Sequence, residues 1–208
     1  MKLKISPTRR DRYFRLLCVP VALLSGSIVS AQDFPSADIA YGTAVADGIV
    51  ENAWDGVSAN PLAVDIDETE PDAADLSGYW KAMWDMDNLY LLIVTMDDTT
   101  VAYPGSSFWN YDMTEVFIDP DNSKGESYDG VNDSQFIFPR GGEDAFESKN
   151  PLAVTLPPAA SGLATGDGMV AIEIALPWSE LAVEPAIGAQ MGFDVYMKDN
   201  DTGEAPRK

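Results

Sequence analysis

Histidine is absent from this chain of 208 residues, and Cys18 is its single cysteine. These absences exclude Ser-His-Asp and Cys-His nucleophile systems, zinc sites built from His and Cys, and haem held by a proximal His. Basic residues are also scarce, because 13 Lys and Arg stand against 34 Asp and Glu, for a formal net charge of −21. A surface this acidic repels phosphate groups, so the composition argues against a nucleic-acid partner.

A nearly continuous apolar run covers residues 16–29, after a stretch that holds six Lys and Arg and one acid. Small residues follow the run, a pattern typical of a secretory signal peptide that is cleaved after Ala31. The run is broken by Pro20 and is short for a membrane span, which needs about 20 residues. We therefore predict a signal peptide at 1–31 and one domain at 32–208, secreted or periplasmic, with no membrane span in the mature chain.

Cleavage would leave a more acidic domain without cysteine. Six of the basic residues and one acid would be lost, so 7 Lys and Arg would face 33 Asp and Glu, for a net charge of −26. A disulfide cannot stabilise such a domain. Its stability must come from a core of sufficient size, from bound cations, or from both.

Short apolar stretches separated by Gly, Pro, Asn and Asp predict an all-β fold, because no sustained helical periodicity is present. The candidate strands are residues 62–66, 79–84, 89–96, 113–118, 134–138, 152–156, 169–175 and 192–197. Residues 85–88 supply a hairpin turn, 177–181 a single helical turn, and 155–168 a loop rich in Pro, Ala and Gly. Eight such strands predict a β-sandwich, or jelly roll, of two antiparallel sheets.

Several segments occur in an order and spacing that resembles a known family. They are DGIVENAW at 47–54, WKAMWDMDNLY at 80–90, WNYDMTEVFIDP at 109–120, and shorter matches at 121–124, 133–136, 173–178 and 192–195. Over about residues 38–200 they resemble the family 9 carbohydrate-binding modules of secreted xylanases and related polysaccharide-binding proteins. The resemblance implies a β-sandwich that grips sugar units at chain ends between two aromatic faces, and it implies calcium binding.

The sugar site implied by the resemblance includes Trp109 as a stacking residue and Glu115, six residues later, as a polar contact. An indole packs well on the apolar C–H face of a pyranose, and the sugar hydroxyls need a few fixed polar groups, which Glu115 and Gln135 can supply. Core packing is the alternative role for Trp109, because Trp is large and often mostly buried. Core packing is the expected role of the other four tryptophans, which fall on or beside apolar segments: Trp54, Trp80, Trp84 and Trp178.

The chain departs from the family pattern in two places. Ile137 and Pro139 stand where the family often has a sugar-binding Arg and Asn. The second stacking aromatic of the family follows the last matched strand, and this sequence ends at Lys208, shortly after that strand. We therefore expect that the C-terminal closing strand and half of the aromatic clamp are missing. A tethered catalytic domain beyond Lys208 is one alternative, and a second binding module or a stop are others.

The acidic segment at 119–133 is the candidate metal site. Its oxygen ligands could provide the six to eight that Ca²⁺ takes, and its glycines would let the loop fold around the ion. The candidate ligands are Asp119, Asp121, Asn122, Asp129 and Asp133. A solvated acidic loop without metal is the alternative, since the spacing does not match an EF-hand.

Three classes of function remain. A non-catalytic carbohydrate-binding module, supporting carbohydrate catabolism, is favoured. A glycoside hydrolase fragment is the second, although nothing in the sequence singles out a pair of carboxylates for catalysis. A haem-binding redox module of similar β-sandwich type is the third, because iron can be held without His by Met and Lys. The residues that keep this alternative open are Met113, Met191, Met197 and Lys198.

Overall fold

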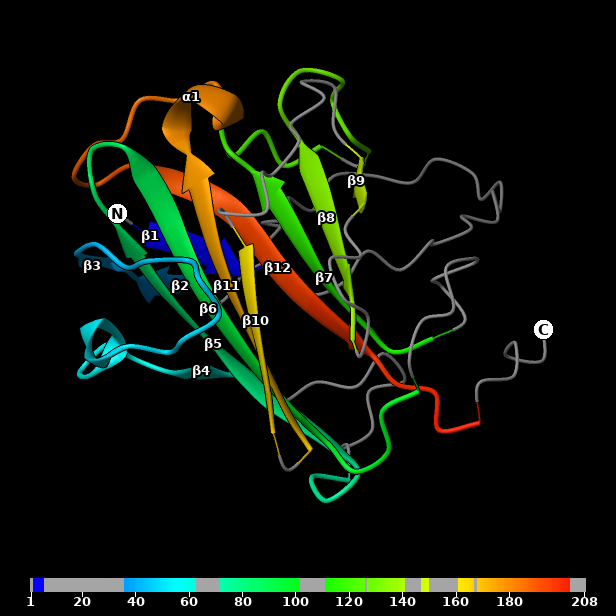
Figure 1. Ribbon diagram of the computed structural model, residues 1–208. Helices are drawn as coiled ribbons and strands as arrows, with labels where there is room; N and C mark the ends of the chain where they lie inside the picture. The colour runs from blue at the N-terminus through cyan, green and yellow to red at the C-terminus, as the bar shows by residue number, and fades with distance from the viewer. Residues whose placement is uncertain are drawn as a thin grey trace, which may run out of the picture.

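Two sheets packed face to face form the body of the protein in the computed structural model (Figure 1). The structure describes residues 2–5, 36–62, 72–101, 111–125, 127–140, 147–149, 161–166 and 168–202. In this part of the chain the only helical elements are the 3-10 turn η1 (Asn52–Trp54) and the single α-turn α1 (Trp178–Leu181). No helix of the described residues is long and apolar enough to span a bilayer.

Sheet B has the strand order β10-β11-β6-β5-β3, and β4 pairs with β5. Its strands are β3 (Ala40–Tyr41), β4 (Asn60–Pro61), β5 (Leu76–Trp84), β6 (Asn88–Asp97), β10 (Ser161–Gly166) and β11 (Met169–Pro177). The β5–β6 hairpin closes at Asp85, whose Oδ1 accepts hydrogen bonds of 2.8 Å from the backbone N–H groups of Asp87 and Asn88. An aspartate that caps its own turn in this way fixes the hairpin register.

Sheet A has the strand order β2-β1-β12-β7-β8-β9. Its strands are β1 (Lys2–Ile5), β2 (Ser36–Asp38), β7 (Met113–Asp119), β8 (Ser134–Pro139), β9 (Glu147–Lys149) and β12 (Gln190–Lys198). All pairs in both sheets are antiparallel except β1 with β12 and β3 with β5.

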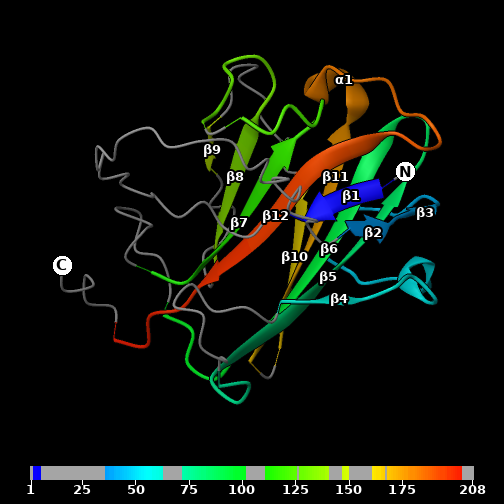
Figure 2. The ribbon, with the colours of Figure 1, turned by 180° about the vertical axis from the view of Figure 1, so that it is seen from behind.

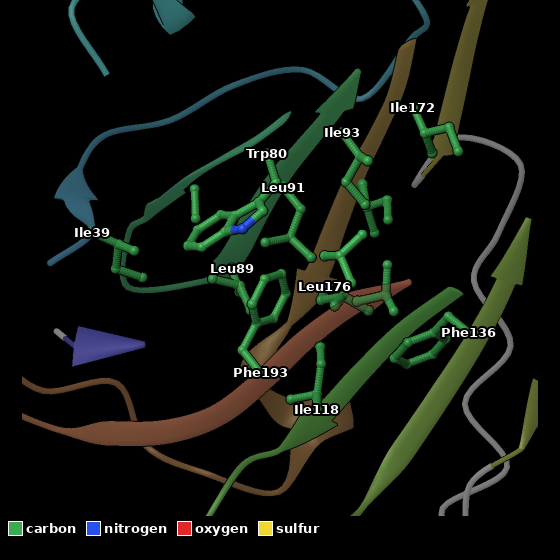
Figure 3. Close-up of a cluster of buried hydrophobic side chains, with 14 of the residues drawn as sticks. Ile39, Trp80, Leu89, Leu91, Ile93, Ile118, Phe136, Ile172, Leu176 and Phe193 are labelled. Atoms are coloured by element: carbon green, nitrogen blue, oxygen red, sulfur yellow. The ribbon is translucent and has the colours of Figure 1, made fainter. Parts of the chain in front are cut away.

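The main core lies between the sheets, because alternate residues of each strand point inward. Trp80 of β5 meets Phe193 of β12 across the sandwich, with ring centroids 4.8 Å apart. Figure 3 shows these rings close together, with Leu91 beside them and Ile93 and Phe136 farther along the same core. This contact joins the two sheets through their inner faces.

The outer face of sheet B has a second apolar layer. The segment at 42–57 crosses it, and Trp54 of η1 packs there against Tyr90 and Leu92 of β6. Trp54 Nε1 donates a hydrogen bond of 3.0 Å to Glu173 Oε1 of β11. The middle of sheet B is therefore covered on both faces, and its strands β6 and β11 are buried at most positions.

The predicted all-β sandwich is confirmed, and six of the predicted strands correspond to β5, β6, β7, β8, β11 and β12. The helical turn is confirmed as α1, and the four tryptophans expected in the core are each 4% exposed or less. The predicted loop at 155–168 was wrong in part, because β10 pairs with β11 and adds a strand to sheet B. Residues 63–66 and the predicted strand at 152–156 lie outside the described residues.

Candidate functional site

Glu115 and Gln135 meet on the outer face of sheet A. They belong to the neighbouring strands β7 and β8, and both alternate with core residues such as Val116 and Phe136. Gln135 Nε2 donates a hydrogen bond to Glu115 Oε2, and the Tyr128 hydroxyl donates one of 3.0 Å to Gln135 Oε1. Glu115 and Gln135, both named from the family resemblance as polar contacts of a sugar, therefore lie side by side on this face.

The strand register extends this polar group across the sheet. Tyr196 of β12 stands opposite Glu115, and Phe117 of β7 stands opposite Gln135. Glu115 is 8% exposed, whereas Tyr128 is 44% exposed. The face therefore offers a sheltered carboxylate and amide beside aromatic groups, a combination suited to a small polyhydroxylated ligand.

Ile137 lies on the same outer face, where the family resemblance implies an arginine. It is buried and packs against Met113 of β7 in a small apolar cluster separate from the main core. Pro139, the other departure from the family pattern, stands opposite Met113 in the strand register. This end of the face is therefore apolar, and any ligand bound there would make contacts different from those of an arginine site.

Trp109 lies outside the described residues, but the two ends of its segment are described. The Asp112 side chain joins them, because its Oδ2 accepts a hydrogen bond of 2.5 Å from the backbone N–H of Val101. Its Oδ1 accepts a hydrogen bond of 2.7 Å from the backbone N–H of Asn200, which follows β12. A fully buried carboxylate thus ties the base of the segment that carries Trp109 to the end of β12.

Arg140 lies beside Asp112 at the end of β8 and is completely buried. Its Nη2 is 3.1 Å from Asp97 Oδ2, 3.9 Å from Asp112 Oδ1 and 3.7 Å from Asp199 Oδ1, and it donates a hydrogen bond of 2.6 Å to the Lys198 carbonyl. These contacts join β6 of sheet B to β7, β8 and β12 of sheet A. One guanidinium therefore holds the same end of both sheets together.

Negative charge exceeds positive charge in this group. Burial, together with the neighbouring Asp97, Asp201 and Asp112, raises the pKa of Asp199 to about 6. Burial also raises the pKa of Asp112, against the lowering effect of its hydrogen bond from Val101 and of the Arg140 charge. Sequence reasoning missed this group, since its only signal was one of the few basic residues at the end of a predicted strand.

The acidic loop at 119–133 is organised by its own backbone. The Asp119 carboxylate accepts hydrogen bonds of 2.9 Å from the N–H groups of both Ser123 and Lys124, and Asp133 Oδ2 accepts one of 2.8 Å from the N–H of Asp129. Burial and then the neighbouring Asp119 raise the pKa of Asp121. The side chains of Asp119 and Asp121 are therefore close neighbours, while the backbone of Asp129 is bound to the Asp133 carboxylate at the other end of the loop.

Asn132 was absent from the predicted ligand set, but the structure makes it a further candidate ligand within the same loop. Asn132 is only 3% exposed, and its Oδ1 accepts no hydrogen bond from the described part of the chain. A buried amide oxygen without a donor is an uncommon arrangement and suits a hard cation. Asn122 adopts φ 55°, which allows the tight bend after Asp121.

Groups of three carboxylates that converge within 4.8 Å occur elsewhere in the described residues. They are Asp75 with Asp199 and Asp201, Asp97 with Asp98 and Asp201, and Asp97 with Asp112 and Asp199. None of these groups contains a residue of the acidic loop at 119–133. Each group contains at least one carboxylate within 4 Å of the Arg140 guanidinium, so that charge already offsets part of theirs.

The methionines that kept the haem alternative open do not converge. Met191 is fully buried in the main core, and Met113 packs with Ile137 on the opposite face of sheet A. Met197 Sδ accepts a hydrogen bond of 3.3 Å from the Thr95 hydroxyl. The three thioethers therefore serve packing and one hydrogen bond between the two sheets.

A shallow pocket lies at the opposite end of the sandwich, beside α1. Met86, Trp178, Val183 and Glu184 are among its lining residues. Trp178 is only 3% exposed and its Nε1 donates a hydrogen bond of 2.9 Å to the Asp85 carbonyl. Because this indole presents no open face, the pocket lacks the stacking platform that a sugar requires.

Residues 46–208 match the model of the family described as "Carbohydrate family 9 binding domain-like". Similar proteins include Endo-1,4-beta-xylanase A of Thermoanaerobacterium saccharolyticum, 29% identical over 85% of this chain and 14% of its own length. Endo-1,4-beta-xylanase A of Thermotoga neapolitana is 27% identical over 79% of this chain, and Exoglucanase XynX of Acetivibrio thermocellus is 28% identical over 85%. The chain spans about 15% of the length of these two relatives.

Two solved structures share the fold. Both are family 9 carbohydrate-binding modules from Caldicellulosiruptor kristjanssonii. The complex with cellotriose has a TM-score of 0.61 at 20% identity and covers 79% of this chain and 76% of that chain. The complex with glucose has a TM-score of 0.65 at 19% identity and covers 80% of each chain.

Proposed function

Because the chain belongs to the carbohydrate family 9 binding domain-like family, we propose that it binds glucose-based or xylose-based saccharides, without cleaving them, on the outer face of sheet A. Trp109 stacks on one face of a sugar ring, and Glu115 and Gln135 bind its hydroxyl groups. The module serves to attach a polysaccharide-degrading protein to its substrate, since the similar xylanases match only a small part of their length.

The observation that carries this proposal is the hydrogen-bonded series of Tyr128, Gln135 and Glu115. Tyr128 donates to Gln135, and Gln135 donates to Glu115, so each polar group is held in one orientation before a ligand arrives. Preorganised polar groups bind hydroxyls at a lower entropic cost than mobile ones. The segment that carries Trp109 leads into β7, the strand of Glu115, and Asp112 holds its base.

The choice of ligands follows from the similar proteins. The two solved structures were obtained with cellotriose and glucose, and three curated relatives are a pair of endo-1,4-beta-xylanases and an exoglucanase. Sugars with equatorial hydroxyls and an apolar ring face are therefore the first candidates. We expect glucose, cellobiose, cellotriose and xylobiose to bind, with the apolar end of the face near Ile137 affecting their ranking.

Titration of these sugars while tryptophan fluorescence is followed tests the proposal. Loss of a stacking face costs about 1–3 kcal/mol, so Trp109→Ala should weaken binding about tenfold to a hundredfold. Tyr41→Ala is the matched control, because Tyr41 is an aromatic residue 66% exposed at the edge of sheet B. Equal affinity of the wild type and Trp109→Ala would place the sugar elsewhere, and absence of binding to any saccharide would remove the proposal.

Calcium in the acidic loop at 119–133 is part of the proposal. The oxygen atoms of Asp119 and Asp121 at one end, Asp129 and Asp133 at the other, and the buried Asn132 amide support it. A cation there would offset like-charge repulsion between neighbouring carboxylates, since burial and then the nearby Asp119 already raise the pKa of Asp121. Asn122 completes the set of ligands expected from the sequence.

Export from the cytoplasm is the last part of the proposed function. A basic stretch, an apolar run of 14 residues and small residues before Ala31 support cleavage of residues 1–31. Secretion would place the module where extracellular polysaccharides are found. The intact mass of the protein recovered from outside the cytoplasm tests this directly, since it shows whether the chain begins at Gln32.

A further inference from the structure

Strand β1 occupies a position inside sheet A, between β12 and β2. Lys2, Leu3, Lys4 and Ile5 are in register with residues 190–193 of β12, and the pairing is parallel. On its other side β1 pairs antiparallel with β2, with Lys2 opposite Asp38. Figure 2 shows β1 lying beside both strands.

The same four residues lie within the segment that the sequence predicts to be a signal peptide. Among the described residues, β2 pairs with no strand other than β1. Ile39, which follows β2, is nevertheless buried in the main core and Ala37 packs against that core. If residues 1–31 are removed, packing keeps β2 in place, and a gap one strand wide opens between β12 and β2.

The β12 side of this position specifies what fits there. Leu3 and Ile5 are in register with Met191 and Phe193, which are 0% and 2% exposed in the main core. Lys2 and Lys4 are in register with the alternate positions, Gln190 and Gly192. A segment that fills the position therefore needs apolar residues opposite Met191 and Phe193, because a polar group at a core position would be buried without a partner.

Charge favours basic residues at the other two positions. Gly192 itself stands opposite Asp119 of β7, so the row that crosses β1, β12 and β7 contains Lys4, a glycine and a carboxylate. Lys2 stands opposite Asp38. The domain at 32–208 carries a net charge of −26, so a cationic strand is attracted to it from a distance as well.

We propose that the position between β12 and β2 is a strand-acceptor site, which in the processed chain takes an extended segment of another polypeptide with alternating basic and apolar residues. The proposal rests on cleavage of residues 1–31 but not on sugar binding. The segment adds parallel to β12 and antiparallel to β2, so it forms main-chain hydrogen bonds on both sides. A second copy of the processed chain cannot supply it, because no two of the seven basic residues in 32–208 stand two positions apart.

Cross-linking tests the register in the full chain. Lys2→Cys with Gln190→Cys, in a Cys18→Ser background, should form an intramolecular disulfide on mild oxidation, because these positions are neighbours across the strand pair. Lys2→Cys with Met96→Cys is the matched control, since Met96 is 43% exposed on sheet B. Equal cross-linking in both proteins, or none in the first, would overturn the site.

Peptide binding tests the acceptor function. Leu3→Asp with Ile5→Asp removes the apolar residues of β1 and should leave the strand position empty. Lys2→Ser with Lys4→Ser keeps Leu3 and Ile5, so β1 should still fill the position. A labelled peptide of residues 1–6 should bind the first variant at least tenfold more tightly than it binds the wild type, whose position is filled. An isomer of that peptide with its two lysines adjacent should bind at least tenfold more weakly, because its alternation is broken.

The outcomes separate the possible occupants. Saturable binding of the alternating peptide to the Leu3→Asp, Ile5→Asp variant, with the in-register disulfide, supports the proposal. Equal binding of the two peptides indicates attraction by charge alone and overturns it. If the Leu3→Asp, Ile5→Asp variant forms a dimer that no longer binds the peptide, the position belongs to a second copy and the proposal is overturned. An exported chain that retains Lys2 would also overturn the proposal, because its own β1 would fill the position.

Discussion

Arg140 and Asp97 form an ion pair of 3.1 Å in which neither side chain is exposed to solvent. Arg140 directly follows β8 of sheet A and Asp97 ends β6 of sheet B, so the pair connects the two sheets where both stop. The same guanidinium contacts Asp112, which closes the base of the segment that carries Trp109. The stability of this end of the sandwich and the placement of the proposed sugar site therefore depend on one cation.

Arg140→Met should destabilise the fold by about 3–5 kcal/mol, because it leaves buried carboxylates without their counter-charge. Urea unfolding followed by fluorescence measures the change. Lys124→Met is the control, since it removes one exposed cation of the loop at 119–133. Loss of less than about 1 kcal/mol in Arg140→Met would show that the buried carboxylates around it do not depend on its charge.

Asp194 should make the fold more stable at acidic pH. Burial raises its pKa to about 7, against the lowering effect of a hydrogen bond from the Val195 N–H. The folded state then binds a proton that the unfolded state has released, so stability falls as the pH rises from about 4 to about 7. Asp199, with a pKa of about 6, adds an effect of the same sign.

Unfolding free energies at pH 4.5, 6.0 and 7.5 measure this slope. Asp194→Asn should reduce the loss of unfolding free energy between pH 4.5 and 7.5 by roughly 2–3 kcal/mol. Each unit of pKa shift is worth about 1.4 kcal/mol, and the full value is lowered because part of the group is solvated. Asp55→Asn, which changes an exposed aspartate, is the control. An unchanged slope in Asp194→Asn would mean that this carboxylate titrates as a solvated group.

The sequence predicted the parts of this structure that depend on local patterning. Apolar alternation located β5, β6, β7, β8, β11 and β12, and their register then placed Glu115 and Gln135 side by side. Prediction from the sequence failed where a strand forms through its pairing partner and not through its own side-chain pattern. Strand β10 has the composition of a loop, and it is a strand because β11 provides its hydrogen-bond partners. The Arg140 group was invisible for a similar reason, since its members come from four separate strand ends.

Trp54→Phe should cost about 1–3 kcal/mol, because it removes the N–H that Glu173 accepts at 3.0 Å in a buried site. Burial already raises the pKa of Glu173, and loss of this donor should raise it further. Trp178→Phe is the matched control, since Trp178 is equally buried but donates to the neutral Asp85 carbonyl. A larger loss in Trp178→Phe than in Trp54→Phe would contradict a special role for the carboxylate.

Glu115→Gln should weaken saccharide binding about tenfold, since a charged acceptor forms stronger hydrogen bonds with hydroxyls than a neutral amide does. The fold should change little, because Gln at this position still accepts from Gln135. Isothermal titration with the ligand that binds the wild type best gives the affinity, and urea unfolding checks stability. Tyr128→Phe removes only the outermost hydroxyl of the series, so its loss of affinity should be smaller.

Calcium should raise the melting temperature of the protein, and a chelator should lower it. A ligand that binds only the folded state adds about 2.7 kcal/mol of stability at a hundred times its Kd. Thermal melts at matched ionic strength separate this effect from screening, because Mg²⁺ at the same concentration screens equally but fits a large oxygen site less well.

Two variants then locate the ion. Asn132→Leu keeps the approximate volume of a buried side chain but removes the amide oxygen that no described group binds, so it should abolish the calcium-dependent shift if the loop at 119–133 holds the ion. Asp201→Asn alters two of the carboxylate groups around Arg140 and should leave that shift intact. The reverse result would move the ion to the Arg140 end of the sandwich, where Asp75, Asp97 and Asp199 could bind it. Identical melting temperatures with calcium and with chelator would exclude a stabilising site in either place.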